Sequence, residues 1–124
     1  MSGDKIILVA DDQEGIRALL KEILQEFYTV LEAKNGAEAL GIIKERRVHL
    51  VLLDVKMSGM CGLETLSSMK EVKPDIKVLM MTGYGDPETL SQVTERGAMG
   101  CLTKPFEIQE MLDKISLALR DEEE

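Results

Sequence analysis

The 124-residue sequence contains little of the residue types that build metal centres from sulfur and nitrogen ligands: two cysteines and one histidine. Cys61 and Cys101 lie 40 positions apart, neither belongs to a C-x-x-C pair, and no histidine accompanies them. This spacing argues against a zinc site and against a disulfide framework. We therefore expect both residues to be reduced thiols of a cytoplasmic protein.

The sequence also lacks long apolar runs and clusters of basic residues. No run is long enough to cross a bilayer and no signal peptide is recognisable, so we expect no membrane insertion. Lys and Arg total 15 against 23 Asp and Glu, a net charge of −8, which argues against direct nucleic-acid binding. Part of this charge belongs to residues 120–124, which we expect to form an acidic, solvated tail.

What the sequence does contain is a regular alternation of short apolar runs and helical patterns. The apolar runs cover residues 6–10, 28–33, 48–54, 76–81 and 100–103, and the helical patterns cover 16–24, 37–47, 63–72, 87–96 and 108–119. The spacing of apolar residues assigns Leu19, Leu90 and Ile108, among others, to buried helix faces.

This alternation predicts an α/β fold: a doubly wound, five-stranded parallel sheet with five helices on its two faces. At this length we expect one domain, residues 1–124, with a core from about 5 to 119.

Polar side chains stand where each central strand ends. Asp11 and Asp12 follow the first strand, Asp54 ends the third, and Thr82 and Lys104 follow the fourth and fifth. In the strand order 2-1-3-4-5, strands one and three are neighbours and flank the position where such sheets bind ligands. We therefore expect three carboxylates, a hydroxyl and an amine to lie together at one edge of the sheet.

This set of groups predicts phosphoryl chemistry. Three adjacent carboxylates would raise one another's pKa values unless a cation lay among them, and oxygen ligands with open positions suit Mg²⁺ or Mn²⁺. Such an ion and Lys104 would balance the three negative charges and attract a phosphoryl group. Asp54 would be its nucleophilic acceptor, the ion and Lys104 would stabilise the transfer, and Thr82 could hydrogen-bond the attached group.

Four motifs resemble the receiver domain of bacterial two-component response regulators, over essentially the whole chain. They are Leu8-Val9-Ala10-Asp11-Asp12, the segment from Leu52-Leu53-Asp54 to Gly62, Met81-Thr82-Gly83, and Leu102-Thr103-Lys104-Pro105-Phe106. One such motif would be weakly diagnostic, whereas four in this order and at these intervals are highly specific. The segments 11–13 and 82–85 are most similar to stand-alone receivers of the sporulation phosphorelay type. The resemblance implies the flavodoxin-like receiver fold.

The resemblance also implies a role for each matching residue. Asp54 matches the phospho-acceptor, Thr82 the switch hydroxyl, and Lys104 the lysine that pairs with the phosphate. The residues that match the ligands of Mg²⁺ are Asp11, Asp12, Asp54 and, through its backbone carbonyl, Lys56. The peptide that matches Lys104-Pro105 is usually cis in the family, so we expect a cis bond here.

Partners follow from the same resemblance. A histidine kinase or a histidine phosphotransferase would supply the phosphoryl group from a phosphohistidine. A downstream protein or a fused output domain would respond to the changed surface around residues 82–104. Such a protein is a regulatory phospho-acceptor and not an enzyme, apart from catalysing its own phosphotransfer and dephosphorylation.

Three positions depart from the family pattern. Cys101 stands where the family usually has an aromatic residue that reports the movement of the switch hydroxyl. Ser58 stands at a usual proline and Cys61 at a usual aspartate, both in the loop after Asp54. None of these changes removes a group that the chemistry needs, so they concern how the phosphorylated state is sensed.

Other classes of function fit the sequence less well. A phosphatase or mutase of the haloacid dehalogenase type also uses a strand-end Asp and Mg²⁺, but it needs a second Asp where Lys56 stands, and it usually carries a cap domain. An interaction module that only keeps the fold would have no need of the intact polar set. A flavin-binding protein would need a phosphate-cradling loop after the first strand, and none is present.

Overall fold

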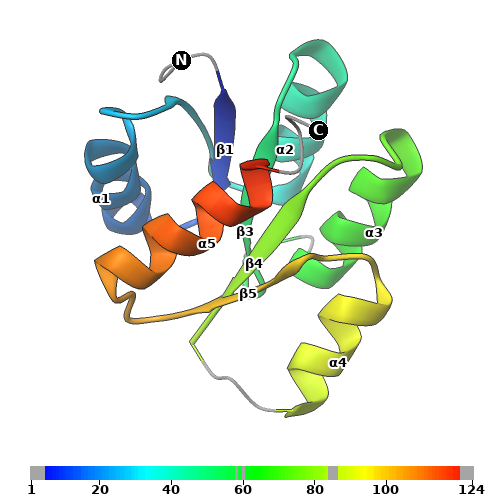
Figure 1. The fold of residues 1–124 in the computed structure, drawn as a ribbon. Helices are drawn as coiled ribbons and strands as arrows, with labels where there is room; N and C mark the ends of the chain where they lie inside the picture. The colour runs from blue at the N-terminus through cyan, green and yellow to red at the C-terminus, as the bar shows by residue number, and fades with distance from the viewer. Residues whose placement is uncertain (1–4, 58, 60, 84–86, 121–124) are drawn as a thin grey trace.

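The computed structural model describes residues 5–57, 59, 61–83 and 87–120, and in it strands and helices alternate along the chain (Figure 1). The elements are β1 (Ile6–Ala10), α1 (Glu14–Leu24), β2 (Thr29–Ala33), α2 (Gly36–Glu45), β3 (Leu50–Asp54), α3 (Gly62–Val72), β4 (Val78–Thr82), α4 (Pro87–Glu95), β5 (Gly100–Thr103) and α5 (Ile108–Arg120). None of the helices in these ranges is long and apolar enough to cross a membrane. α5 ends one residue beyond the expected core boundary at 119.

The five strands form one sheet in the order β2-β1-β3-β4-β5, and every neighbouring pair is parallel. This confirms the predicted fold class and strand order. Because all strands run the same way, their carboxyl ends meet at one edge, and β1 lies beside β3 there. The connection between strands reverses direction at this pair, which is where ligands bind in doubly wound sheets.

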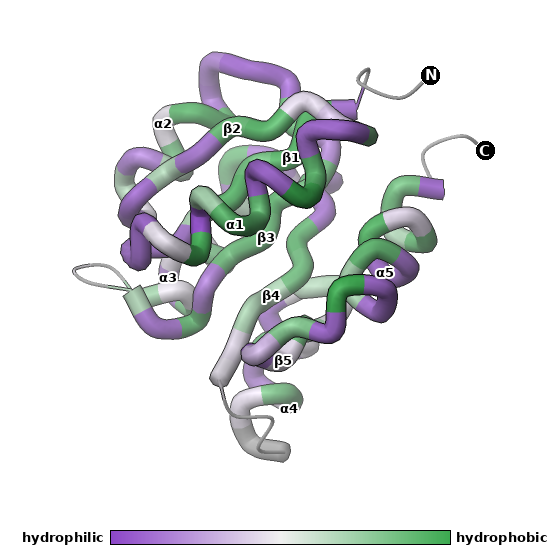
Figure 2. The backbone as a smooth tube through the Cα atoms, turned by 90° about the vertical axis from the view of Figure 1, so that its left-hand side faces the viewer, coloured by the Kyte–Doolittle hydropathy of each residue, from purple (hydrophilic) through white to green (hydrophobic). Residues whose placement is uncertain are grey.

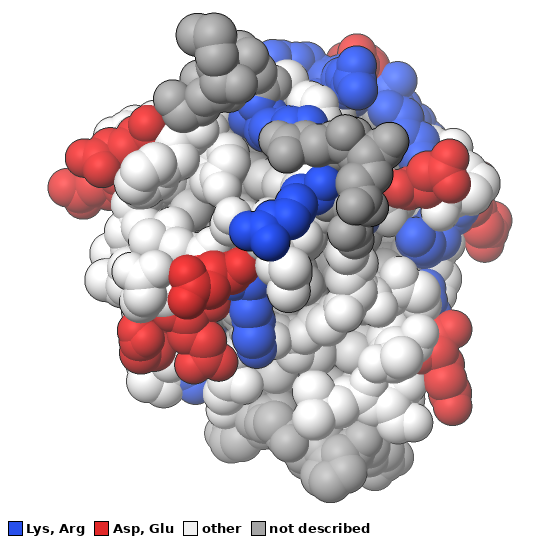
Figure 3. Space-filling model, viewed as in Figure 1, with Lys and Arg blue, Asp and Glu red and all other residues white. Residues whose placement is uncertain are grey.

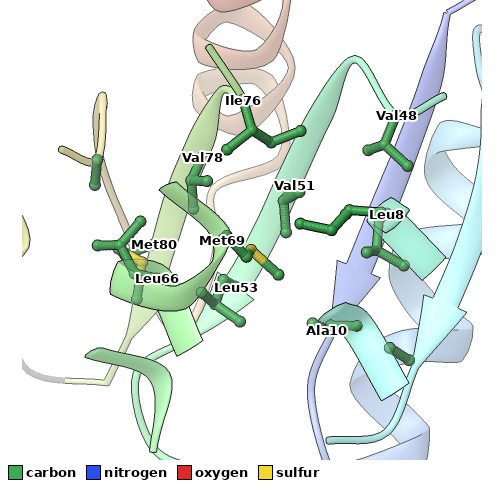
Figure 4. Close-up of a cluster of buried hydrophobic side chains, with 14 of the residues drawn as sticks. Leu8, Ala10, Val48, Val51, Leu53, Leu66, Met69, Ile76, Val78 and Met80 are labelled. Carbon is green, nitrogen blue, oxygen red and sulfur yellow. The ribbon is translucent and has the colours of Figure 1, made fainter. Parts of the chain in front are cut away.

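Two apolar cores lie on opposite faces of the sheet. In β3 every residue is buried, with Val51 and Leu53 in the core under α2, α3 and α4 and Leu50 and Leu52 in the core under α1 and α5. Figure 4 shows the first core, in which Leu66 and Met69 of α3 lie over β3 and β4. Figure 2 shows hydrophobic residues concentrated along the central strands. A strand buried on both faces holds its last residue, Asp54, in a rigid position.

Three residues that apolar spacing assigned to buried helix faces are exposed, so these predictions were wrong. Leu19 in α1 is 47% exposed, Leu90 in α4 37% and Ile108 in α5 51%. Spacing defines an apolar stripe along a helix, but the packing of the helix against the sheet decides how much of that stripe is covered. The same helices bury Leu20, Val93 and other members of their stripes completely.

His49 explains why β3 begins at Leu50 and not at residue 48 as predicted. The amide of Ile6 donates to Nδ1 of His49 (2.9 Å), while the amide of His49 donates to the carbonyl of Ile6 (2.8 Å). The imidazole ring therefore takes the place of a backbone acceptor, and regular pairing of β1 with β3 starts after it. This histidine lies at the amino end of the strand, opposite the edge that carries Asp54.

Gly62 is the point where the chain after β3 turns back into α3. Its amide donates to the carbonyl of Val55 (2.9 Å). A Cβ atom placed on it would overlap the carbonyl oxygen of Asp54 and lie 2.7 Å from Cα of Val55. Both neighbours are backbone atoms and cannot move aside without shifting the end of β3. Glycine is therefore required here by close approach and not by an unusual backbone angle.

We expect Gly62→Ala to lower the free energy of unfolding by about 1–3 kcal/mol, because the added methyl group must displace the backbone that carries Asp54. Gly41→Ala is the matched control, since a Cβ at Gly41 meets nothing within 4 Å. In the middle of α2 that change should raise stability by about 0.5–1 kcal/mol. Urea denaturation of both variants checks the difference, and equal effects at the two positions would contradict the close approach.

Candidate functional site

Three carboxylates converge at the carboxyl edge of the sheet. Asp54 is the last residue of β3, and Asp11 follows β1 directly. Both are buried, with exposed fractions of 6% and 0%, while Asp12 is exposed. One carboxylate oxygen from each lies within 4.8 Å of the others. The structure thus brings together the three acidic residues that the sequence placed at this edge.

Lys104 closes the cluster from the neighbouring side. It follows β5 directly, and its Nζ lies 2.8 Å from Oδ2 of Asp11 and 3.5 Å from Oδ1 of Asp54. Its amide donates to the carbonyl of Thr82 (2.8 Å), and the following peptide, Lys104-Pro105, is cis as expected. The lysine therefore contacts both buried carboxylates from a position fixed by the end of β4.

Thr82 and Lys56 complete the predicted set. Thr82 is the last residue of β4, the strand beside β3, and is 5% exposed. The amide of Lys56 donates to Oδ1 of Asp54 over 3.4 Å, a long hydrogen bond. The roles expected of the Thr82 hydroxyl and the Lys56 carbonyl stay predictions.

The environment of Asp54 raises its pKa from 3.8 to about 6. Burial is the largest cause, because it disfavours the charged form, and the negative charge of Asp11 adds to it. The charge of Lys104 and the amide of Lys56 act in the opposite direction but do not cancel the first two. Three carboxylates meet one contacting lysine in this cluster, and an excess of negative charge favours binding of an additional cation.

The loop that carries Asp11 and Asp12 is fastened through its main chain. The amide of Asp11 donates to the carbonyl of Ala33 in β2 (3.1 Å), and the amide of Gln13 donates to Oδ1 of Asp11 (2.9 Å). A guanidinium nitrogen of Arg17 in α1 donates to the carbonyl of Asp11 (2.8 Å). Sequence reasoning missed Arg17, because no motif marks an arginine whose partner is a main-chain oxygen.

Positive charge is unevenly distributed over the molecule. On the face drawn in Figure 3, Lys and Arg side chains gather at the top of the view, where the amino ends of the strands lie (Figure 1). Several basic residues in the described chain come just before a strand and so belong to that end: Lys5, Arg46, Arg47, Lys73 and Lys77. Near the acidic cluster, Lys104 contacts the carboxylates of Asp11 and Asp54, and Arg17 donates to the main-chain carbonyl of Asp11.

Two of the positions that depart from the family pattern, Cys61 and Cys101, are described by the structure, and neither belongs to the cluster. Cys61 is the N-cap of α3 and makes no side-chain cap hydrogen bond, and its Sγ lies 3.5 Å from Oε1 of Glu64. Cys101 is half-buried on β5, and burial raises the pKa of its thiol. Ser58 lies outside the described residues.

Comparison with known proteins agrees with this geometry. The family model of the response regulator receiver domain matches residues 7–116. Sporulation initiation phosphotransferase F of Bacillus subtilis is 43% identical over 116 residues, which cover 93% of each chain. Chemotaxis protein CheY of Halobacterium salinarum is 38% identical, over 90% of this chain and 94% of its own. Transcriptional regulatory protein ZraR of Klebsiella oxytoca is 37% identical, and the match spans 27% of its length.

Solved structures agree as well. A CheY-like receiver domain protein of Methanospirillum hungatei superposes with a TM-score of 0.91 at 33% identity, covering 96% of each chain. Response regulator TrrA of Thermotoga maritima, solved in complex with Mg²⁺-BeF, superposes with a TM-score of 0.85 at 37% identity, over 93% of this chain and 99% of its own. The chain therefore belongs to the response regulator receiver domain family.

Proposed function

We propose that this protein is a phospho-accepting signalling switch of a two-component system or phosphorelay. Asp54 takes a phosphoryl group from the phosphohistidine of a histidine kinase or a histidine phosphotransferase, in the presence of Mg²⁺ or Mn²⁺. The observation that carries the proposal is the convergence of Asp11, Asp12, Asp54 and Lys104 at one edge of the sheet. A merely structural turn would have no use for three carboxylates packed so closely.

Asp54 is suited to be the nucleophile. With a pKa of about 6 its carboxylate is mostly ionised at neutral pH, and its burial removes much of the water that would otherwise shield it. In the transfer, one Asp54 oxygen forms a bond to phosphorus while the bond between phosphorus and the donor's imidazole nitrogen breaks. The imidazole leaves with the electron pair of that bond.

The cations of the site would offset the charge that the phosphoryl group brings. Lys104 already lies between Asp11 and Asp54, so it can pair with a phosphoryl oxygen near Asp54. Asp11, Asp12, Asp54 and the Lys56 carbonyl would hold the divalent ion. That ion would supply electrostatic stabilisation of the phosphoryl oxygens.

Phosphorylation would be sensed at the ends of β4 and β5. The phosphoryl group adds roughly two negative charges at neutral pH. The hydroxyl of Thr82, on the neighbouring strand, would donate a hydrogen bond to it. The amide of Lys104 donates to the carbonyl of Thr82, so a movement of Thr82 would reach the start of the segment after β5. The surface around residues 82–104 would change its population of states and so control a partner.

The partner on the output side is a downstream protein or a fused domain. Phosphotransferase F and CheY match this chain over nearly their whole lengths, whereas ZraR matches over 27% of its length. Receivers of this family thus occur in both settings. For this chain we propose a single receiver domain over residues 1–124 that acts in the cytoplasm.

Intact-mass spectrometry after incubation with Mg²⁺ and a small phosphodonor tests the acceptor role. We expect the protein to gain one phosphoryl mass, and we expect Asp54→Asn and a metal-free sample to gain none. Asp75→Asn is the matched control, because Asp75 is an exposed carboxylate before β4 at the opposite end of the sheet. A phosphoryl adduct on Asp54→Asn, or no adduct on the native protein under any condition, would refute the proposal.

The raised pKa of Asp54 has a consequence for stability. Because the folded state binds this proton more tightly than the unfolded state does, stability falls as the pH rises from about 4 to about 6 and the penalty persists above that range. Asp54→Asn removes the penalty, so without metal it should be more stable than the native protein by roughly 1–3 kcal/mol at pH 7.5.

Urea denaturation of both proteins in chelator, between pH 4 and pH 7.5, measures this difference. The gain should shrink as the pH approaches 4, and added Mg²⁺ should narrow it at pH 7.5 because the cation stabilises only the carboxylate form. A gain that is independent of pH, or a loss of stability at pH 7.5, would show that Asp54 carries no such penalty.

A further inference from the structure

Arg17 connects the acidic loop to the neighbouring strand. One nitrogen of its guanidinium donates to the carbonyl of Asp11 (2.8 Å), and its Nε donates to Oε1 of Glu32 in β2 (3.3 Å). The side chain of Arg17 is only 15% exposed. Lys21, one turn later in α1, lies 3.7 Å from the other oxygen of Glu32 and is 49% exposed. The two basic residues share a partner, but Arg17 is the one with a contact to the acidic loop.

The contact with Asp11 is made to a group that helix α1 leaves unpaired. The first backbone hydrogen bond of α1 runs from the amide of Arg17 to the carbonyl of Gln13 (3.2 Å), two residues beyond Asp11. Asp11 lies after the last residue of β1 and before the first residue of α1. A strong charge-assisted donor such as a guanidinium is well suited to fix it.

Fixing this carbonyl also fixes the residue that follows. The carbonyl of Asp11 and the amide of Asp12 belong to one planar peptide unit, so a bond to the oxygen sets the plane on which Cα of Asp12 lies. Asp11 is held in addition through its amide and its side chain. Asp12 is the exposed member of the cluster, and the Arg17 bond restrains the peptide that sets its direction.

We propose that Arg17, oriented by Glu32, is a positioning residue that holds Asp12 in place as a ligand for the divalent cation. This inference rests on the proposed function, because it assumes that the acidic cluster binds such an ion. Arg17 acts through the main chain of Asp11 and does not itself touch the ion or the phosphoryl group. Partners that orient the ligands of a metal typically change its affinity by 10- to 100-fold when they are removed.

The positive charge of Arg17, taken alone, would change the affinity for the cation in the opposite direction. Arg17 is a positive charge close to a cation site, so its electrostatic contribution opposes binding, and removing it should tighten binding. Loss of positioning should weaken binding instead. The direction of the change in affinity therefore separates the two roles, and a purely structural link between α1 and β2 would change stability with no loss of affinity in the folded protein.

The experiment is isothermal titration of the full-length protein with Mn²⁺, alongside urea denaturation without metal. We expect Arg17→Met to weaken Mn²⁺ binding by about tenfold. Arg17→Lys, which keeps the charge but cannot reproduce the forked contact to two partners, should weaken it in the same direction. Lys21→Met is the matched control: it removes a cation that contacts the same glutamate, and it should change the affinity less than twofold.

Each outcome bears on the proposal. Unchanged or tighter binding in Arg17→Met overturns it, as does an equal loss in Lys21→Met. If Arg17→Met does not fold, Arg17→Lys decides, because affinity equal to that of the native protein would overturn the positioning role. Native protein that binds no Mn²⁺ would overturn the metal site and this inference together. Binding that Asp12→Asn weakens but neither Arg17 variant affects would overturn this inference alone.

Discussion

The burial of Asp54 beside Asp11, at the carboxyl edge of the sheet, is the constraint on which the arrangement of the structure depends. One oxygen of each of these two carboxylates lies within 4.8 Å of an oxygen of the other and of the exposed Asp12. Water screens the two buried carboxylates poorly. Lys104 contacts both of them, yet burial and, after it, the charge of Asp11 still raise the pKa of Asp54 to about 6. Folding thus holds together groups that would separate if they were free. The free-energy cost of keeping these carboxylates charged remains in the folded protein, and it makes the site favour cations. Selection for function commonly leaves such a cost in place.

A rigid framework is needed to hold a buried carboxylate beside another one. β3 is buried along its whole length, and the helices that cover its two faces fill both cores with large aliphatic and methionine side chains. Gly62 lets the chain return within contact of the Asp54 backbone, which closes the loop after β3. The peripheral elements can be less tightly covered, because β3 and its immediate neighbours carry the carboxylates. Ile108 and Leu90 are exposed, although other residues of α5 and α4 pack into the two cores.

The sequence was sufficient to predict the fold and the meeting of Asp11, Asp54 and Lys104, because both follow from where strands end in a parallel sheet. It was insufficient for two kinds of feature. The exposure of Leu19 depends on how α1 packs against the sheet, and apolar spacing does not define this packing. The bond from Arg17 to the Asp11 carbonyl joins a side chain to a main-chain oxygen, and Glu32, which orients it, lies on another strand. Local sequence patterns do not indicate such tertiary contacts.

The residues that depart from the family pattern concern how a phosphorylated state would be sensed, and not the groups proposed to accept the phosphoryl group. Cys101 lies on β5 and Cys61 at the start of α3, and the contacts of Lys104 with Asp11 and Asp54 involve neither thiol. A cysteine cannot sweep out the volume of an aromatic ring, so Cys101 is too small to report a movement of Thr82 by exchanging places with it. The hydrogen bond from the Lys104 amide to the Thr82 carbonyl is one backbone link between the ends of these strands, beside the parallel pairing of β4 with β5. Under the proposed function, these backbone contacts offer a route between β4 and β5 that needs no aromatic side chain at position 101.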